Sequence, residues 1–473
     1  MLSLAVAAAL SPTALPAELP DRFTAGSVSV DGRKFEYQLL VPDDVEPETK
    51  LPLVLFLHGA GERGSDNQSQ LVHFPAPMAT KRRRTSMPCF VLAPQCPSGE
   101  RWSSAPWGEI KSRPIDPEPT VPLQAAIEAL AEVVREHPVD TDRIYLTGLS
   151  MGGYGALDLA QRHPDWFAAV VPVCGGGDER QAARLAGIPI SIWHGDADRA
   201  VPVERSRQMV AALKELGETP EYNELRGVGH NAWDFAYDDA GGCLKWMFAQ
   251  RRDPGRRLAA AARLMAKSLA PDERIAFLGD SITQAGARPN GYVDRLRSVI
   301  AKAHPRAEVI PAGISGNRIP DLLAREQVDV RAKRPTIVFT YIGINDVWHS
   351  KNGKGTPLEE YRYGLRGLLG GFERAGATNV VATPTLIGEA PEGENELDEM
   401  LSGHVAAARA VGSEDGCTLC DLHAAFRAHE RIFNAAGASQ GCLTTDGVHL
   451  NDAGNVLVAT EVALAIRAAA EAR

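Results

Sequence analysis

The chain has 473 residues, which is too long for one ordinary hydrophobic core, so two domains are expected. Its content of 44% hydrophobic and 23% charged residues is typical of a soluble globular protein. A formal net charge of −10 gives no support for a nucleic-acid partner, and the basic run Lys81–Arg84 is interpreted as a solvated loop. No stretch looks long and apolar enough to span a membrane, so no membrane partner is expected.

Residues 1–20 begin with a short, apolar, alanine-rich stretch that is followed by prolines and alanines. This composition resembles the hydrophobic and cleavage regions of a secretory signal, although the usual basic residues before them are missing. The sequence therefore predicts a secreted or periplasmic protein. If the segment is instead a disordered or wrongly assigned start, the protein is cytoplasmic.

The seven cysteines are few and odd in number, so disulfides are not expected to hold the fold together. Cys417 and Cys420 fit alternating positions of a strand and lack a second pair of ligands at zinc-like spacing. The sequence therefore predicts no metal site and no cofactor.

The first half of the chain alternates strand and helix patterns. Residues 26–41 alternate apolar and polar around Asp31-Gly32, which predicts a hairpin. The later predicted elements are buried strands around a helix at 123–136; the strands are Leu53–Leu57, Phe90–Ala93, Arg143–Leu146, Ala168–Cys174, Ile188–Trp193 and Tyr222–Leu225. This order predicts a mainly parallel sheet covered by helices, with active residues at the C-terminal ends of its strands.

The segment Thr147–Gly153 carries a serine on a predicted strand-to-helix turn, with glycine two residues before and two after Ser150. This is the nucleophile-elbow pattern, in which the glycines avoid collisions in a sharp, strained turn. The N-terminus of the following helix favours a developing oxyanion at the serine. The alternative is a glycine-rich turn with an idle serine.

Two later strand ends supply an acid and a base. Asp198 follows the strand that ends at Trp193, and His230 follows the last strand. The order Ser150, Asp198, His230 is that of a hydrolase triad, in which the histidine takes the serine proton and the aspartate orients the imidazole. Asp196 is the rival acid, and Asp198 is preferred because it lies deeper in the loop.

An oxyanion hole is predicted from the N–H of Met151 and an N–H of the turn at Gly59 and Ala60. His58 and His194 are interpreted as structural residues at strand ends. Tryptophans near strand ends either stack on a sugar or phenolic group of the substrate or pack in the core. Substrate binding is predicted for Trp102, Trp107 and Trp233, and Trp193 carries the same two interpretations.

Residues of about 25 to 250 resemble the α/β-hydrolase superfamily, and within it the feruloyl-esterase-like and prolyl-oligopeptidase-like esterases. The residues that carry the resemblance are Leu57–Gly64, Pro94–Cys96, Gly148–Gly153 and His194–Pro202. The resemblance implies an α/β-hydrolase domain over residues 21–250, and it leaves open whether an ester or a peptide bond is cleaved. Residues 251–273, with paired arginines and an alanine-rich stretch, are interpreted as a partly helical linker.

Residues 274–473 carry four sequence blocks, each at a predicted strand end or near the C-terminus. They are Gly279–Thr283, Ala312–Asn317, Tyr341–Asp346 and Thr444–Asn451. The blocks closely resemble the SGNH/GDSL hydrolase family. The resemblance implies a flavodoxin-like three-layer α/β/α domain.

This resemblance implies a second catalytic set made of Ser281, Asp446 and His449. Its spacing has a physical reason, because Asp446 and His449 share one short turn and the acid orients the imidazole directly. The oxyanion donors would be the Ser281 and Gly313 N–H groups and the Asn345 side chain. Asp280 and Asp346 are interpreted as structural residues. The alternative is a degenerate domain, although nothing catalytic is missing.

The sequence thus predicts a two-domain α/β protein that removes acyl groups, acetyl and feruloyl among them, from plant-type polysaccharide at two serine sites. The alternative function is a peptidase or general carboxylesterase in the first domain with a small-ester hydrolase in the second. A third interpretation, that one domain only binds carbohydrate, is disfavoured by a full triad in each half.

Overall fold

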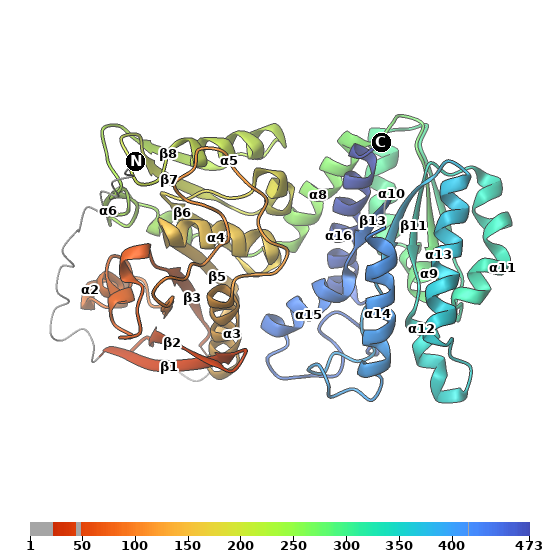
Figure 1. Ribbon diagram of the computed structural model, residues 1–473, viewed down its shortest axis with the longest axis horizontal. Coiled ribbons are helices and arrows are strands. Elements are labelled where there is room, and N and C mark those ends of the chain that lie inside the picture. The colour runs from red at the N-terminus through yellow and green to blue at the C-terminus, as the bar shows by residue number, and fades with distance from the viewer. Residues whose placement is uncertain (1–21, 44–48, 415) are drawn as a thin grey trace, which may run out of the picture.

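The structure is a computed structural model that describes residues 22–43, 49–414 and 416–473. It contains two α/β domains side by side, the first in red to green and the second in green to blue in Figure 1. The predicted signal segment, residues 1–20, lies outside the described residues. The predicted two-domain α/β fold is confirmed.

The first domain is built on an eight-stranded sheet in the order β1-β2-β4-β3-β5-β6-β7-β8. The predicted hairpin is present, and the strands from β4 to β8 run parallel. The bounds are β1 Phe23–Val30, β2 Arg33–Leu40, β3 Leu51–Leu57, β4 Phe90–Pro94, β5 Val139–Leu149, β6 Ala169–Val173, β7 Ser191–Gly195 and β8 Glu221–Leu225.

Helices cover both faces of this sheet because its central strands are apolar on both sides. In β3, Leu53, Leu55 and Leu57 join the hydrophobic cluster of one face, while Val54 and Phe56 join the cluster of the other. The first cluster includes α3 Val121–Glu136, α4 Met151–Arg162 and α5 Glu204–Glu215. The second includes residues of α1 Pro75–Met78, α6 Trp233–Ala236 and α7 Leu244–Phe248.

The basic run is not the solvated loop that the sequence predicts. It opens α2, Lys81–Ser86, and Arg83 is buried. The Arg83 guanidinium donates to the Asp239 carboxylate at 2.8 Å and to the Tyr237 carbonyl at 2.6 Å. The prediction fails because the partner of Arg83 lies far along the chain, where local sequence gives no sign of it.

The predicted linker contains α8, Pro254–Ser268, whose N-terminus is capped by the Asp253 side chain. One side of α8 packs on α10, Tyr292–Ala303, and α16, Asp452–Glu471, of the second domain. On the other side, the Arg257 guanidinium donates to Asp165 at 2.6 Å and to the Ala186 carbonyl at 3.0 Å. This segment is therefore a structural helix that both domains contact.

The second domain has five parallel strands in the order β10-β9-β11-β12-β13, as the predicted flavodoxin-like fold requires. The strands are β9 Arg274–Gly279, β10 Glu308–Gly313, β11 Ile337–Tyr341, β12 Thr378–Ala382 and β13 Cys417–Cys420. One face is covered by α8, α10 Tyr292–Ala303 and α16 Asp452–Glu471. The other is covered by α11 Ile319–Asp329, α13 Leu358–Arg374 and α14 Asp398–Gly412.

The helix α16 corrects another prediction. By length and composition it passes as a membrane-spanning helix, with 20 residues and a mean hydropathy of 1.4. In the structure 61% of its apolar window is buried, and the helix packs against α8, α10 and β13. A helix that is apolar nearly all round is also what the core of a soluble domain requires.

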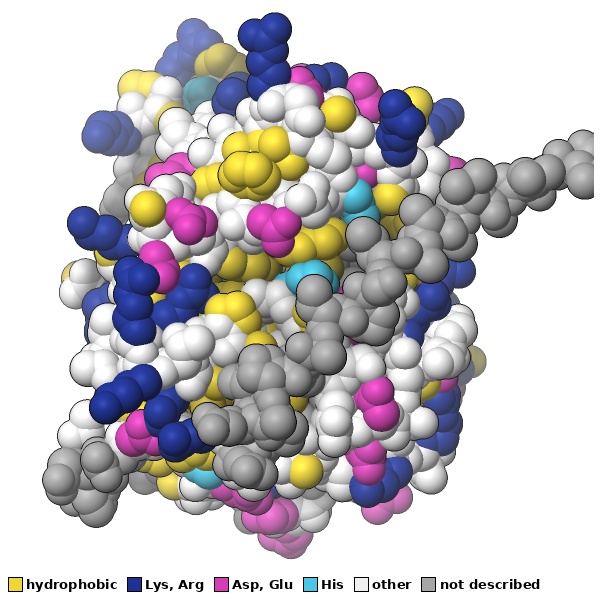
Figure 2. Space-filling model, turned by 90° about the vertical axis from the view of Figure 1, so that its left-hand side faces the viewer, with side chains coloured by type: hydrophobic (Ala, Val, Ile, Leu, Met, Phe, Trp, Pro, Cys, Tyr) yellow, Lys and Arg dark blue, Asp and Glu magenta, His cyan; other side chains and the backbone are white. Residues whose placement is uncertain are grey.

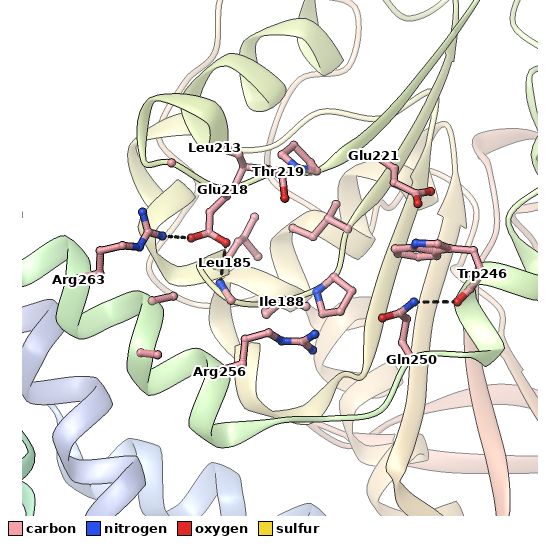
Figure 3. A pocket seen from close by; sticks show the side chains of 17 residues that line it. Leu185, Ile188, Leu213, Glu218, Thr219, Glu221, Trp246, Gln250, Arg256 and Arg263 are labelled. Atoms are coloured by element: carbon pink, nitrogen blue, oxygen red, sulfur yellow. Dashed lines mark hydrogen bonds and ion pairs between the residues drawn. The ribbon is translucent and has the colours of Figure 1, made fainter.

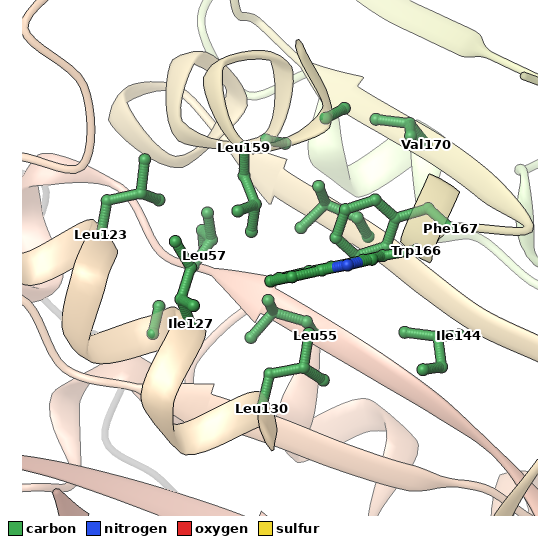
Figure 4. Packing of buried hydrophobic residues seen from close by; sticks show 14 of the residues in the cluster. Leu55, Leu57, Leu123, Ile127, Leu130, Ile144, Leu159, Trp166, Phe167 and Val170 are labelled. Atoms are coloured by element: carbon green, nitrogen blue, oxygen red, sulfur yellow. The ribbon is translucent and has the colours of Figure 1, made fainter. Parts of the chain in front are cut away.

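The two domains meet where Trp166 lies against α15, Leu422–Phe433. The indole is 1% exposed and packs among the residues drawn in Figure 4. Its Nε1–H donates to the carbonyl of Ala428 in the second domain at 3.0 Å. An ion pair of 2.5 Å between Arg184 and Glu461 also crosses the interface. Both apolar packing and polar contacts therefore hold the domains together.

We predict that Trp166→Ala destabilises the first domain by about 3–5 kcal/mol, because it leaves a cavity in the core and removes the bond to Ala428. Trp166→Phe is the matched control, since it keeps most of the ring and leaves only the Ala428 carbonyl unpaired, a loss of about 1–3 kcal/mol. Calorimetry should show that the alanine variant separates the unfolding of the two domains. Equal effects of both variants would contradict the packing role.

Candidate active sites

The first site is built on the turn between β5 and α4. Ser150 has φ 54° and ψ −118°, a strained conformation for a residue with a side chain. A Cβ at Gly152 would lie 1.8 Å from the Leu57 carbonyl oxygen, and one at Gly148 would lie 2.3 Å from the Gly152 oxygen. The two glycines are therefore required by the close approach of the turn to β3.

The structure brings Ser150, His230 and Asp198 into one hydrogen-bonded chain. His230 Nε2 lies 2.9 Å from Ser150 Oγ, and His230 Nδ1 lies 2.7 Å from Asp198 Oδ2. Asp198 Oδ1 accepts the N–H groups of Ala200 and Val201 at 2.8 and 2.9 Å. This arrangement orients the imidazole so that Nε2 accepts the serine proton.

The Asp198 side chain has no solvent exposure. Burial alone would raise its pKa, but hydrogen bonds from His194, His230 and the Val201 N–H hold that pKa well below the usual range. The rival acid, Asp196, is exposed, and its Oδ1 accepts the Gly227 N–H at 2.6 Å. The geometry therefore assigns the acid position to Asp198.

The predicted oxyanion donors lie beside Ser150. Met151 is the first residue of α4, so its N–H is one of the donors that a helix leaves free in its first turn. A Cβ at Gly59 would lie 3.6 Å from Ser150 Cβ, which places the Gly59–Ala60 turn against the serine. The geometry permits an oxyanion hole at this point.

His58 holds this turn, as the sequence suggests. Its Nε2 accepts the Cys96 N–H at 2.9 Å, and its Nδ1 donates to the Gly59 carbonyl at 2.6 Å. Complete burial lowers the pKa of His58 to about 4. The ring is therefore neutral near pH ~7 and serves as a fixed hydrogen-bonding spacer.

Two tryptophans are buried, so the predicted substrate role of Trp102 is wrong, and Trp193 follows its alternative interpretation of core packing. Trp102 is 1% exposed, and its Nε1–H donates to the His58 carbonyl at 3.0 Å. Trp193 is buried and donates to Ser191 at 3.0 Å. Trp107 is half-buried, with the Arg101 guanidinium 5.8 Å from its ring centroid.

Trp233 lies beside His230, but it is 7% exposed and packs in the core, so its predicted contact with a substrate is wrong as well. Its ring is perpendicular to that of His230, with centroids 5.3 Å apart, and a second histidine, His73, lies 5.1 Å away. His73 has φ +74°, rare for a residue with a side chain, and its Nε2 is 3.7 Å from Glu62 Oε1. The sequence analysis missed His73, because no local motif marks it. On the face seen in Figure 2, hydrophobic side chains and histidines gather in a hollow.

The second site lies at the end of β9, where Ser281 opens α9, Ser281–Gly286. Ser281 Oγ lies 2.9 Å from His449 Nε2, and His449 Nδ1 lies 2.7 Å from Asp446 Oδ2. Asp446 Oδ1 also accepts the His449 backbone N–H at 2.8 Å. Partial burial raises the pKa of Asp446, but these bonds from His449 hold it below its usual value.

Gly313 and Asn345 are placed to serve as further oxyanion donors. A Cβ at Gly313 would lie 2.3 Å from the Gln284 nitrogen, so this backbone approaches α9 closely. Asn345, in α12 Ile344–Trp348, donates one amide hydrogen to the Asn317 carbonyl at 3.1 Å. Its second amide hydrogen remains for a substrate oxygen.

The turn with Asp446 and His449 is anchored by a residue that the sequence analysis missed. The buried Glu389 carboxylate accepts three consecutive N–H groups, those of Cys442, Leu443 and Thr444, at 2.6–2.7 Å. Among the described residues no arginine or lysine pairs with Glu389. These three hydrogen bonds therefore fix the start of the turn that carries Asp446 and His449.

Comparisons with known proteins agree with this geometry. A family model described as "Phospholipase/Carboxylesterase" matches residues 43–242, and one described as "GDSL-like Lipase/Acylhydrolase family" matches residues 277–457. An "Acetylxylan esterase" of Geobacillus stearothermophilus is 32% identical over 208 residues, which are 40% of this chain and 90% of that protein.

The chain belongs to the α/β-hydrolase and GDSL esterase families. A "Putative esterase NocK" of Nocardia uniformis subsp. tsuyamanensis is 31% identical over 201 residues, 42% of this chain and 55% of that protein. A solved "Thermostable Esterase" is 39% identical with a TM-score of 0.45, and the match covers 49% of this chain and 64% of that one. By its two family matches, this esterase chain combines two domains of carboxylic ester hydrolase families.

A cavity of about 690 Å³ lies away from both serines of the esterase. It is lined by Ile188–Ile190 and Thr219–Glu221, at the N-terminal ends of β7 and β8, and by α8. Figure 3 shows Trp246, Gln250 and Arg256 around it. Ser150 lies at the opposite edge of the sheet, so this cavity is not the site of the reaction.

We predict that Asp198→Asn slows fluorophosphonate labelling of Ser150 by about a thousandfold or more, because the amide no longer fixes the imidazole tautomer. The background is Ser281→Ala, so that only the first site reacts. Asp196→Asn is the matched control and should stay within about threefold of the parent, since an amide oxygen still accepts the Gly227 N–H. The reverse order of effects would assign the acid to Asp196.

The second site contains a buried carboxyl whose titration affects stability. Burial raises the pKa of Asp280 to about 7, and the nearby Asp346 carboxylate adds to this rise. The folded state therefore binds this proton more tightly than the unfolded chain, whose aspartates titrate near pH ~3.9. The contribution of Asp280 to the free energy of unfolding is fully present below about pH 4 and is lost as the pH rises towards about 7.

We therefore predict that Asp280→Asn stabilises the second domain at about pH 8 by a free energy of unfolding on the order of a few kcal/mol, which is measured as a higher melting temperature. The asparagine oxygen still accepts the Ile282 N–H that Asp280 Oδ1 now accepts. The exposed Asp272 supplies the control, Asp272→Asn, which should leave the melting temperature unchanged. The prediction fails if the pH dependence of melting is the same in wild type and Asp280→Asn.

Proposed function

We propose that the enzyme has two working serine esterase sites and removes different acyl groups from one acylated polysaccharide. The observation that carries the proposal is the pair of complete hydrogen-bonded chains, Ser150–His230–Asp198 and Ser281–His449–Asp446. Each chain has the serine, base and acid within 2.9 Å of their partners.

The proposed reaction follows the same course at both sites. His230 or His449 takes the hydroxyl proton through Nε2 as Ser150 or Ser281 attacks the ester carbonyl. N–H donors at Met151 and the Gly59–Ala60 turn, or at Ser281, Gly313 and Asn345, stabilise the oxyanion. The protonated histidine then gives its proton to the leaving alcohol, and water hydrolyses the acyl-enzyme.

For the second domain we propose acetyl groups on sugar hydroxyls as the substrate. The acetylxylan esterase among the relatives of the chain supports a sugar acetate. For the first domain we propose a bulkier or aromatic ester such as feruloyl, or an acetyl at another position. The support is Phe235 of α6, which is 46% exposed and lies two residues after Trp233, the buried neighbour of His230.

The docking of the two domains supports a shared polymeric substrate. Once one site binds the polymer, a second site on the same chain meets it at an effective concentration of up to about millimolar. A small soluble ester gives no such gain. A secreted or periplasmic enzyme fits a polysaccharide substrate, and we include that location in the proposal.

The test uses single-site variants of the full chain. Ser150→Ala and Ser281→Ala should each abolish release of one acyl group from acetylated, feruloylated xylan and leave the other. The wild type is then compared with a mixture of both variants that contains the same number of intact sites of each kind. We predict faster release by the wild type on the polymer, and equal rates on p-nitrophenyl acetate.

Equal rates on the polymer would remove the shared-substrate argument. Loss of all activity in one variant would leave only one working site. Inactivity on every polysaccharide, with activity on simple esters or peptides, would favour the alternative of a peptidase or general carboxylesterase joined to a small-ester hydrolase.

A further inference from the structure

His194 lies directly behind the acid of the first site. It is in β7, its side chain is completely buried, and its Nε2 lies 3.3 Å from Asp198 Oδ2. The same Oδ2 accepts the Nδ1–H of His230 at 2.7 Å. One carboxylate oxygen of the proposed triad therefore faces two imidazoles.

The neighbours of His194 decide which ring nitrogen carries hydrogen. Nε2 faces Asp198 Oδ2 and, at 3.1 Å, the Val201 carbonyl, and both of these oxygens only accept. Nε2 must therefore be protonated. Nδ1 lies 2.7 Å from Ser206 Oγ, a hydroxyl that donates to Nδ1 when the ring is neutral. Ser206 Oγ also lies 3.0 Å from the Gly175 carbonyl, to which it turns when the ring is charged.

We propose that His194 is a positioning residue of the first site, whose Nε2–H binds Asp198 Oδ2 and limits how strongly this carboxylate raises the basicity of His230. The inference rests on the proposed function of that site. Because Asp198 divides its charge between two donors, it stabilises the His230 imidazolium less than an undivided carboxylate would. His230 thereby reaches its neutral, reactive form at a lower pH.

Other polar groups also face this pair of residues. Cys174 follows β6, and its Sγ lies 3.4 Å from the His230 carbonyl. The same Sγ lies within 4.8 Å of a ring nitrogen of His194 and of a carboxylate oxygen of Asp198. Burial raises the pKa of Cys174 above its usual range, so the thiol is neutral. Glu224 pairs in register with His194 on β8, but it is exposed and bound to Arg207 at 2.6 Å. His194 therefore faces Asp198 as its one buried carboxylate among the described residues.

The test follows the pH dependence of Ser150 labelling by a fluorophosphonate in full-length Ser281→Ala enzyme. We predict that His194→Phe, which keeps a ring but no donor, shifts the midpoint of the ascending limb upwards by about one pH unit. His194→Gln should restore a midpoint close to the parent value, because its amide donates to Asp198 and accepts from Ser206. A merely structural role would lower the labelling rate without moving the midpoint.

Ser206→Ala provides a second, milder variant that keeps the histidine ring. Without the hydroxyl that binds Nδ1, the ring is held less firmly with its Nε2–H on Asp198 Oδ2, so the midpoint should shift in the same direction by a smaller amount. This variant decides the question if His194→Phe does not fold, as judged by circular dichroism.

The inference is overturned if the midpoint does not move in folded His194→Phe. If His194→Phe does not fold, an unmoved midpoint in Ser206→Ala overturns it. If the parent is not labelled at Ser150 at all, the proposed function of the first site fails and this inference falls with it. A labelled parent with unmoved variants overturns the positioning role alone, so the two failures are distinguishable.

Discussion

The first site depends on the contact between the backbone of the Ser150 turn and the carboxyl end of β3. The Leu57 carbonyl lies where any side chain at Gly152 would be, so the turn is pressed against the sheet. That contact keeps Ser150 at φ 54° and directs the start of α4 at the serine. The elbow, the oxyanion donors and the position of the hydroxyl all follow from this one close approach, which only glycine permits.

The two domains hold the acid and the base in different ways. In the first, Asp198 and His230 come from separate loops, and the acid side chain is fully buried. In the second, both residues share one turn, and the Asp446 side chain is 50% exposed. Water screens the second carboxylate, so its orientation depends on the backbone N–H groups of Val448 and His449. The first acid relies on burial and several donors instead.

The candidate residues Ser150, Asp198, His230 and Ser281 could be predicted from the sequence because each follows a strand, and strand ends converge at one edge of a parallel sheet. Asp446 and His449 follow no strand, and only the resemblance of their sequence block to a known family indicated them. The same reasoning failed for Trp102, whose place near a strand end says nothing about the His58 carbonyl that binds its indole. It failed for Arg83, whose partner Asp239 is distant in sequence. Glu389 and His73 were missed for the same reason, because their neighbours are set by tertiary packing alone.

The helix α8 has a consequence for how such a chain could be rearranged. It links the domains, yet it also forms part of the outer layer over β9 and is held to the first domain by Arg257. A boundary drawn at residue 274 would strip the second domain of a helix that covers its core. The exchangeable module therefore begins at Asp253, the cap of α8, and any new partner placed before it must present its own acceptor for the Arg257 guanidinium.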